Sequence, residues 1–186
     1  IKTEELSKVV AVMYKQFLSL QVDQVGVELI LCNNENNQLQ FWSSLISQNK
    51  LPECYNIQKS SHSFFKKQWD AWKTKKDRLV IVLDGLKKKE FDKFIFSKTD
   101  FGKFPAQDKK LIRSRKKDVF THTWMKYGLL EVAADEPLSD EGFHVLQRFA
   151  KVFEQAYTRF LDLQKAEAQA REASIELGLE RVRARA

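Results

Sequence analysis

Cysteine and histidine are the side chains most suited to binding metals or acting as nucleophiles, and this chain has few of them. Its cysteines are Cys32 and Cys54, and its histidines are His62, His122 and His144. A zinc site needs several such ligands at characteristic spacing, whereas these five residues are widely separated and fall on different predicted elements. We therefore predict no metal site, and we interpret the histidines as structural or surface residues.

Catalytic groups are equally hard to assemble from the spacing. No Ser-His-Asp arrangement and no pair of carboxylates placed for acid–base chemistry can be argued from the sequence. The triplet Asp100-Phe101-Gly102 matches a kinase motif in letters, but the residues around it do not support a kinase fold. We therefore expect this segment to be non-catalytic, with no identified cofactor.

The formal net charge of +7 raises the question of a nucleic-acid or anionic-lipid partner. The lysines lie in clusters such as 73–76 and 87–89, which favour solvated loops and helix faces. No helix-turn-helix, zinc-finger or RNA-binding signature accompanies the charge, so we expect no nucleic-acid partner. A basic module that binds nucleic acid or anionic lipid stays open as the alternative, supported by the arginine-rich tail over 181–185.

Two cysteines are too few for a disulfide framework and fit a reducing, cytoplasmic compartment. No apolar run approaches the ~20 residues of a membrane span, and no signal peptide is visible. Because the chain starts at Ile1 and stops inside a helical pattern at Ala186, we expect a segment of a longer protein. We predict no membrane insertion here, although the parent protein can still be membrane-associated.

The elements that position these residues alternate between helix and strand. Apolar residues at three- and four-residue steps predict a first helix over 6–20. Aliphatic residues over 25–31, an Asn-rich turn over 33–37 and a return over 39–42 predict a β-hairpin. The apolar run over 78–83 predicts a central strand buried on both faces.

Shorter patterns complete the prediction. The remaining elements are a short strand over 55–59, a helix over 62–74, short helices or loop pieces over 91–96 and 107–115, and strands over 119–127 and 129–133. In the strand over 119–127, Phe120, His122 and Trp124 fall on one face. Strands joined by hairpins, with helices first, between and last, predict an α+β fold whose central sheet is largely antiparallel and flanked by helices.

A long C-terminal helix is the clearest single feature. Ser139 is a suitable N-cap, Asp140 and Glu141 complement the positive end of the helix, and Leu138 and Phe143 are spaced as a hydrophobic staple. The chain then runs to Ala186 without proline. If wholly helical, these roughly 48 residues would span ~70 Å at 1.5 Å per residue.

The apolar stripe of this helix is bulky at first and then thins to alanine, within mixed charges. That pattern predicts a two-stranded coiled coil, and hence a homodimer through the terminal helices. The predicted dimer and signalling residues are Phe149, Phe153, Ala156, Phe160, Leu163, Ala170 and Leu177.

Three segments resemble a known family. The stretches over 159–173 and 175–185 are similar to the connector in bacterial multidomain sensor proteins, many of them sensor histidine kinases. The hairpin over 124–132 followed by Pro137-Leu138-Ser139 is similar to the end of GAF domains. The phosphate-accepting motif of a histidine kinase is absent around His144, as is a glycine-rich ATP lid, so any kinase parts lie beyond this segment.

The resemblance implies a GAF-like sensory domain over 1–163 and a coiled-coil signalling helix over 164–186. Such a module would relay the state of a ligand or partner through its terminal helix to an output domain of the same chain. The resemblance also implies a pocket between the sheet and its covering helices, for a small molecule that the sequence does not identify. Its candidate lining, which would otherwise be solid core, is Trp42, Phe65, Trp69, Trp72 and Trp124.

A chromophore linked through a cysteine thioether, as in some GAF photosensors, would need a supporting Asp and His set. The sequence offers no such set, so we predict no chromophore.

Overall fold

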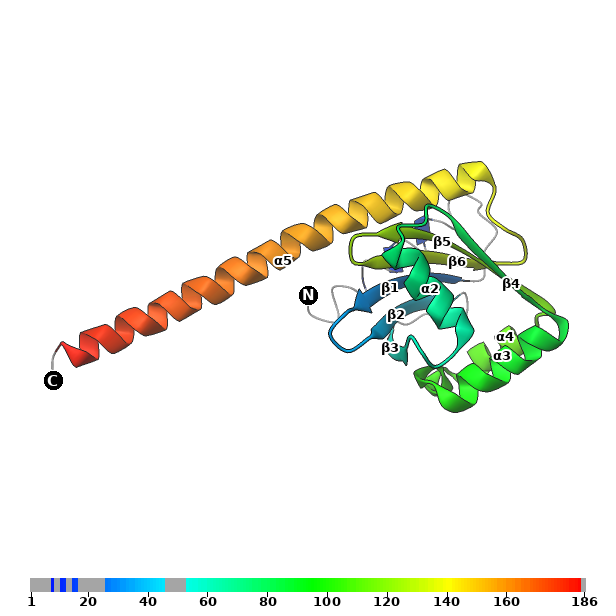
Figure 1. Ribbon diagram of the computed structural model, residues 1–186, viewed down its shortest axis with the longest axis horizontal. Helices are drawn as coiled ribbons and strands as arrows, with labels where there is room; N and C mark the ends of the chain where they lie inside the picture. Colours follow the sequence, from blue (N-terminus) through cyan, green and yellow to red (C-terminus); the bar gives the residue numbers. More distant parts are fainter. Residues whose placement is uncertain (1–7, 9–10, 13–14, 17–25, 46–52, 185–186) are drawn as a thin grey trace.

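The computed structural model describes residues 8, 11–12, 15–16, 26–45 and 53–184. The predicted helix over 6–20 falls mostly outside these residues, and the described residues within it are helical. The rest forms a six-stranded antiparallel sheet with helices on both faces and a long terminal helix (Figure 1). The predicted α+β fold is therefore confirmed.

The strands lie in the order β3-β2-β1-β6-β5-β4 across the sheet. Their bounds are β1 Gly26–Asn33, β2 Gln38–Leu45, β3 Glu53–Gln58, β4 Leu79–Asp84, β5 Lys117–Met125 and β6 Gly128–Ala134. The helices are α2 Ser63–Lys73, α3 Gly85–Lys98, the 3-10 helix η1 Asp100–Lys103, α4 Ala106–Ser114 and α5 Asp140–Arg183.

Local turn chemistry explains both hairpins of the central strands. Asn37 adopts a left-handed φ of 56°, and the Asn33 side chain accepts a hydrogen bond from the Glu35 N–H at 2.9 Å, as an Asn-rich turn predicts. At the second hairpin, a Cβ on Gly128 would lie 1.8 Å from the carbonyl oxygen of Ile30. Only glycine allows β1 and β6 to approach this closely.

The prediction of a central strand over 78–83 was wrong, because β4 is the edge strand of the sheet. Its residues alternate: Ile81 is buried, whereas Val80 and Val82 are 37% and 48% exposed. The apolar run therefore belongs to an edge strand that buries only one of its two faces. Strands β1 and β6, at the middle of the sheet, are buried on both faces.

The two faces of the sheet carry separate cores. One face packs against α5 and contains mainly aliphatic strand residues with Phe143, Leu146, Ala150 and Phe153 from the helix. The other face lies under α2, α3, η1 and α4 and is dominated by phenylalanine. Phe120 and Trp124 pack on this second core and Met125 on the first, as the predicted alternation in β5 requires.

Helix α5 is anchored at its start. Ser139 caps it by accepting a hydrogen bond from the Gly142 N–H at 3.1 Å, so the predicted cap is confirmed. Just before the cap, the Leu138 N–H donates to the Thr121 hydroxyl of β5 at 3.3 Å. Arg78, before β4, donates to Asp140 at 2.8 Å.

A second anchor holds the middle of α5. At the β5–β6 turn, the Lys126 N–H donates to Glu154 at 2.5 Å, and the Tyr127 and Thr158 hydroxyls lie 2.8 Å apart. Every described residue from Asp162 onward is exposed, and this part of α5 extends away from the sheet (Figure 1). Within the described residues, no helix combines the length and apolar content of a membrane span.

Candidate functional site

A cavity of about 70 Å³ lies between the sheet and the helices on the face opposite α5. Most of its wall is aromatic: the phenylalanines are Phe41, Phe64, Phe65, Phe91, Phe101, Phe104 and Phe120. Their rings meet edge to face or tilted, as in the Phe64–Phe91 pair at 4.6 Å between centroids and the Phe41–Phe101 pair at 5.2 Å. These are the preferred geometries of packed rings, so the wall is well supported.

Two carboxyl groups from adjacent strands interrupt this aromatic wall. Glu28 of β1 and Glu131 of β6 are directly paired in the sheet, and their side chains hydrogen bond to each other on the cavity side. Ser43 of β2 donates a hydrogen bond to Glu28, and the amide of Gln68 in α2 donates to Glu131 at 2.7 Å. The pair therefore joins three strands and a helix.

Burial determines the protonation of this pair. Loss of solvation raises the pKa of Glu28 well above its ordinary value, and the neighbouring Glu131 raises it further. Burial also raises the pKa of Glu131 to about 7. The two groups thus share a proton near neutral pH, because two adjacent carboxylates in this apolar setting would repel each other.

His122 of β5 extends the same cluster. Its Nε2 lies 2.5 Å from a Glu131 oxygen and its Nδ1 lies 3.2 Å from the carbonyl oxygen of Leu79. Because that carbonyl can only accept, Nδ1 donates to it, and Nε2 faces the Glu131 carboxyl and the Gln68 amide. Burial lowers the pKa of His122 to about 4, so its imidazole is neutral near pH 7.

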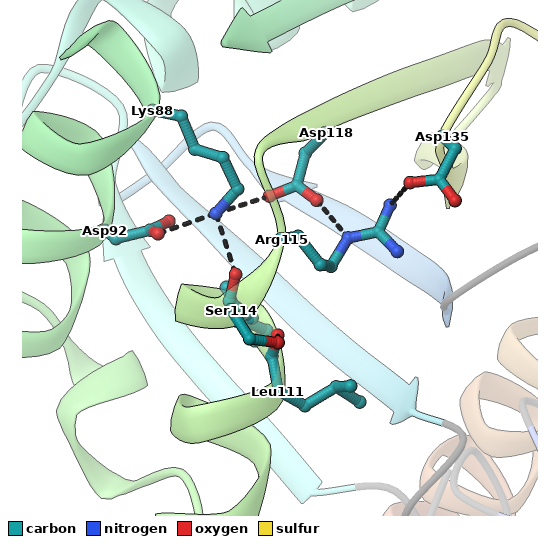
Figure 2. Close-up of polar contacts among 8 residues, drawn as sticks. Lys88, Asp92, Leu111, Ser114, Arg115, Asp118 and Asp135 are labelled. Carbon is teal, nitrogen blue, oxygen red and sulfur yellow. Dashed lines mark hydrogen bonds and ion pairs between the residues drawn. The ribbon is translucent and has the colours of Figure 1, made fainter. Parts of the chain in front are cut away.

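A second polar cluster contributes Asp92, Arg115 and Asp118 to the cavity wall. Figure 2 shows the polar contacts within this cluster. The ammonium of Lys88, a residue only 1% exposed, lies 2.6 Å from Asp92 of α3 and 3.0 Å from Asp118 of β5. It also donates to the carbonyl oxygen of Ile112 at 2.8 Å. Arg115 contacts Asp118 at 2.5 Å.

The guanidinium of Arg115 also lies 2.9 Å from the carboxylate of Asp135. Burial raises the pKa of Asp92, while the hydrogen bond and charge of Lys88 act against that rise. The predicted exposure of the lysines over 87–89 is thus wrong for Lys88, which lies at a buried junction of α3, α4 and β5.

The two clusters differ in their charge balance. Asp92 and Asp118 each face at least one cation, whereas the described partners of Glu28 and Glu131 are Ser43, Gln68, His122 and each other. The described part of the chain therefore places no lysine or arginine against the glutamate pair.

The structure does not bring the five predicted pocket residues together. Phe65 lines the cavity, and Trp69 is buried in the same core. Trp72 and Trp124 pack at the margin of that core, whereas Trp42 lies on the opposite face against the α5 core. Trp72 has a different contact, because its indole N–H donates to the carbonyl oxygens of Met125 and Lys126 at 3.1 and 3.3 Å.

The predicted dimer residues divide into two sets. Phe153 is buried against the sheet, and Phe149 and Phe160 are partly buried. These three phenylalanines are therefore less accessible to a second chain than the remaining residues of the set. The exposed members of the set are Ala156, Leu163, Ala170 and Leu177. Val152, which the sequence reasoning did not single out, is 64% exposed and lies four residues before Ala156.

The predicted ligand-type residues stay apart. Burial raises the pKa of the Cys32 thiol to about 12 and that of Cys54 to about 11, so neither is an activated nucleophile. His62 caps α2 by accepting the Phe64 N–H at 3.1 Å, and His144 is exposed on α5. Among the described residues, no group of three or more His, Cys, Asp or Glu side chains is arranged to hold a metal ion.

Sequence reasoning missed the glutamate pair, although a signal was present. Glu28 and Glu131 each stand inside an apolar strand with aliphatic residues on both sides. In a sheet covered on both faces, strand alternation buries such a residue whichever way it points. A lone acid within a doubly covered strand is thus a marker of a buried polar site.

The fold and the cavity together define an α+β domain whose antiparallel sheet separates an aromatic core with a cavity from a more aliphatic core under α5. A solved structure with a similar fold is residues 122 to 287 of a methyl-accepting chemotaxis protein, with a TM-score of 0.50 and 12% sequence identity. The match covers 85% of this chain and 90% of that one. Searches of protein-family models and of curated proteins found no match.

Proposed function

We propose that this chain is a non-catalytic, GAF-type sensory and dimerisation module of a signal-transduction protein. It relays the state of its cavity through α5 to an output domain that follows in the same chain. The observation that carries the proposal is α5 itself, a single helix of 44 residues. Its first part contributes to one core of the domain, and its described residues from Asp162 onward are exposed.

A continuous set of contacts leads from the cavity to α5. Phe64 and Phe65 of α2 line the cavity, and Trp72 at the end of α2 donates to the backbone of the β5–β6 turn. The same turn holds Glu154 and Thr158 of α5. A shift of α2 against the sheet would therefore move the point at which α5 leaves the domain.

The exposed part of α5 supports dimerisation. From Leu163 onward, small or apolar residues recur at alternating three- and four-residue steps, the spacing of a parallel two-stranded coiled coil. Val152 and Ala156 continue the same stripe toward the domain, with Arg159 at the position between Ala156 and Leu163. The seam residues are Val152, Ala156, Leu163, Ala166, Ala170, Ala173 and Leu177. Because several are alanine, the two helices would associate weakly, and a modest change in the domain would alter their packing.

The comparison supports the fold of this proposal. The similar structure belongs to a methyl-accepting chemotaxis protein, and a role in signalling for the present chain is our inference from that likeness together with α5. The division at residue 163 belongs to the same proposal. A sensor histidine kinase is the kind of parent protein that the connector resemblance favours.

Cysteine cross-linking tests the dimer. We expect Leu163→Cys and Ala170→Cys to give disulfide-linked dimers under mild oxidation. The matched controls are Lys165→Cys and Glu172→Cys, which lie two residues, or about 200°, further round the helix and are also exposed. Equal cross-linking at all four positions, or a strict monomer in sedimentation at high concentration, would contradict the proposal.

A second candidate function rests on the distribution of charge. Residues 85–117 contain twelve lysines and arginines against four acidic residues, so this segment exceeds the +7 of the whole chain. In the structure it forms α3, η1 and α4 at one end of the molecule (Figure 1). This face favours a nucleic-acid or anionic-lipid partner, and binding at low salt that is lost in Lys89→Glu/Lys93→Glu would support it.

A further inference from the structure

We infer that the cavity is a binding site for a small organic cation, a protonated amine, held between phenylalanine rings and the Glu28–Glu131 pair. This inference deepens the proposed function, because it names the chemical class of the signal.

The walls suit such a ligand. The faces of aromatic rings attract cations, and an ammonium enclosed by several rings is bound more strongly because it is desolvated. Seven phenylalanines line the cavity, and none contributes a hydrogen-bonding group. A ligand with many polar groups would leave most of them without partners against these walls.

The charges of the cavity select a cation over an anion. The buried Lys88 and the partly buried Arg115 already contact Asp92, Asp118 and Asp135. An anion would have to compete with those carboxylates and would also meet Glu28 and Glu131. A cation would instead face the one pair of cavity carboxyls that the described chain leaves without a counter-charge.

The size of the cavity limits the ligand. Its volume of about 70 Å³ is well below the roughly 300–1,000 Å³ of pockets that hold drug-sized ligands. A ligand of only a few non-hydrogen atoms, such as a butylammonium ion, is therefore a better match than a nucleotide, a haem or a bilin. Ligands this small reach affinities between millimolar and micromolar at best.

Binding of a cation would release a proton. The groups that face the pair are Glu28 of β1, Ser43 of β2, Gln68 of α2, His122 of β5 and Glu131 of β6, with the charge of Asp118 nearby. Near neutral pH they share protons that an incoming ammonium would displace. Affinity should therefore rise with pH, by up to about tenfold per unit while one proton is released.

Calorimetry and thermal shift with the intact chain test the inference. The probes are n-butylamine, butan-1-ol and butyrate, which share a similar size and differ in charge. We expect butylamine at up to about 10 mM to bind and to raise Tm, with tighter binding at pH 7.5 than at pH 6. We expect butan-1-ol and butyrate to bind at least tenfold more weakly.

Variants locate the site. Glu28→Gln and Glu131→Gln should each weaken butylamine binding at least tenfold, whereas Glu35→Gln, in the exposed β1–β2 turn, should leave it unchanged. The wild-type probe series keeps the test decisive if a cavity variant fails to fold. Equal binding of butan-1-ol or butyrate, or no binding of butylamine, would overturn the inference.

The same samples separate this inference from the proposed function. If butyrate binds instead and changes cross-linking through Leu163→Cys, the relay stands and the ligand class is wrong. If butylamine binds without altering that cross-linking, the site stands and the relay is wrong.

Discussion

The two faces of the sheet are covered by cores of different composition. Against α5, the described core residues are mostly aliphatic, joined by Trp42, Phe143 and Phe153. Under α2, α3 and α4, the core is aromatic and hollow, and Glu28, Lys88, Asp92, Asp118 and Glu131 surround it. One side therefore holds the terminal helix rigidly, while the other carries groups whose charge state can change.

This difference teaches how a small domain can combine sensing with transmission. A solid apolar interface moves as a unit, because closely packed side chains transmit displacement rather than absorb it. A hollow interface with buried titratable groups responds to a ligand or a proton, because its packing is incomplete. The following predictions test that division.

The largest effect should come from the buried lysine on the hollow side. Lys88→Met leaves Asp92 and Asp118 without their shared cation, and we expect a loss of about 3–5 kcal/mol in the free energy of unfolding. Lys89→Met, at the exposed neighbouring position, should change it by less than about 0.5 kcal/mol. Urea denaturation measures both, and equal effects would show that the buried cluster is not structural.

Matched truncations compare the packing of the two cores. Leu146→Ala on the α5 side should cost about 3–4 kcal/mol, because Leu146 is fully buried in a filled core. Ile95→Ala should cost about 2 kcal/mol, because Ile95 already borders the cavity and makes fewer contacts there. The reverse order in chemical denaturation would refute the contrast between a solid and a hollow face.

The pH dependence of stability should reveal the protonated pair. The folded-state pKa of Glu28 is raised above its unfolded value, so its contribution is present at low pH and is lost as pH rises through that raised pKa. The raised pKa of Glu131 also makes stability fall as pH rises toward about 7. The pKa of His122 is lowered to about 4, so this residue makes stability rise with pH between about 4 and 6.5.

Glu28→Gln removes the Glu28 contribution and also changes the hydrogen bond to Glu131 and the charge that faces His122. Between pH 5 and pH 8, the wild type should therefore lose more stability than the variant. Denaturation curves at both pH values measure this difference. Identical pH profiles would mean that Glu28 ionises normally.

The smallest effect should come from removing the exposed part of α5. A chain ending at Leu163 should unfold with a free energy within about 0.5 kcal/mol of the wild type in dilute solution, because the described residues from Asp162 onward are exposed. The same truncation should abolish the cross-linked dimer. A large loss of stability in the monomer would show that the tail folds back on the domain.

Elements set by local chemistry could be predicted from the sequence. The Asn-rich turn defined the β1–β2 hairpin, and Ser139 with Leu138 defined the start of α5, because caps and turns depend on neighbours in the chain. The alternation of Phe120, His122 and Trp124 placed these residues on one face for the same reason.

Features that depend on distant pairing could not be predicted. Nothing near 79–84 specifies that β4 pairs with β5 alone, so its apolar run indicated a central strand although it forms an edge. Strand alternation places Trp42 and the adjacent Phe41 on opposite faces of the sheet, but it does not specify which of these faces packs against α2. Likewise, the burial of Lys88 within a run of three lysines depends on Asp118, thirty residues away, which only the folded sheet brings beside it.

The anchor at Thr158 makes the rest of α5 a lever. From that contact to Arg183 the helix extends for about 38 Å at 1.5 Å per residue. A tilt of about 5° at the β5–β6 turn would displace the far end by roughly 3 Å, about half of one helical turn. A change too small to disturb the core would thus become a displacement large enough to shift one helix against its partner.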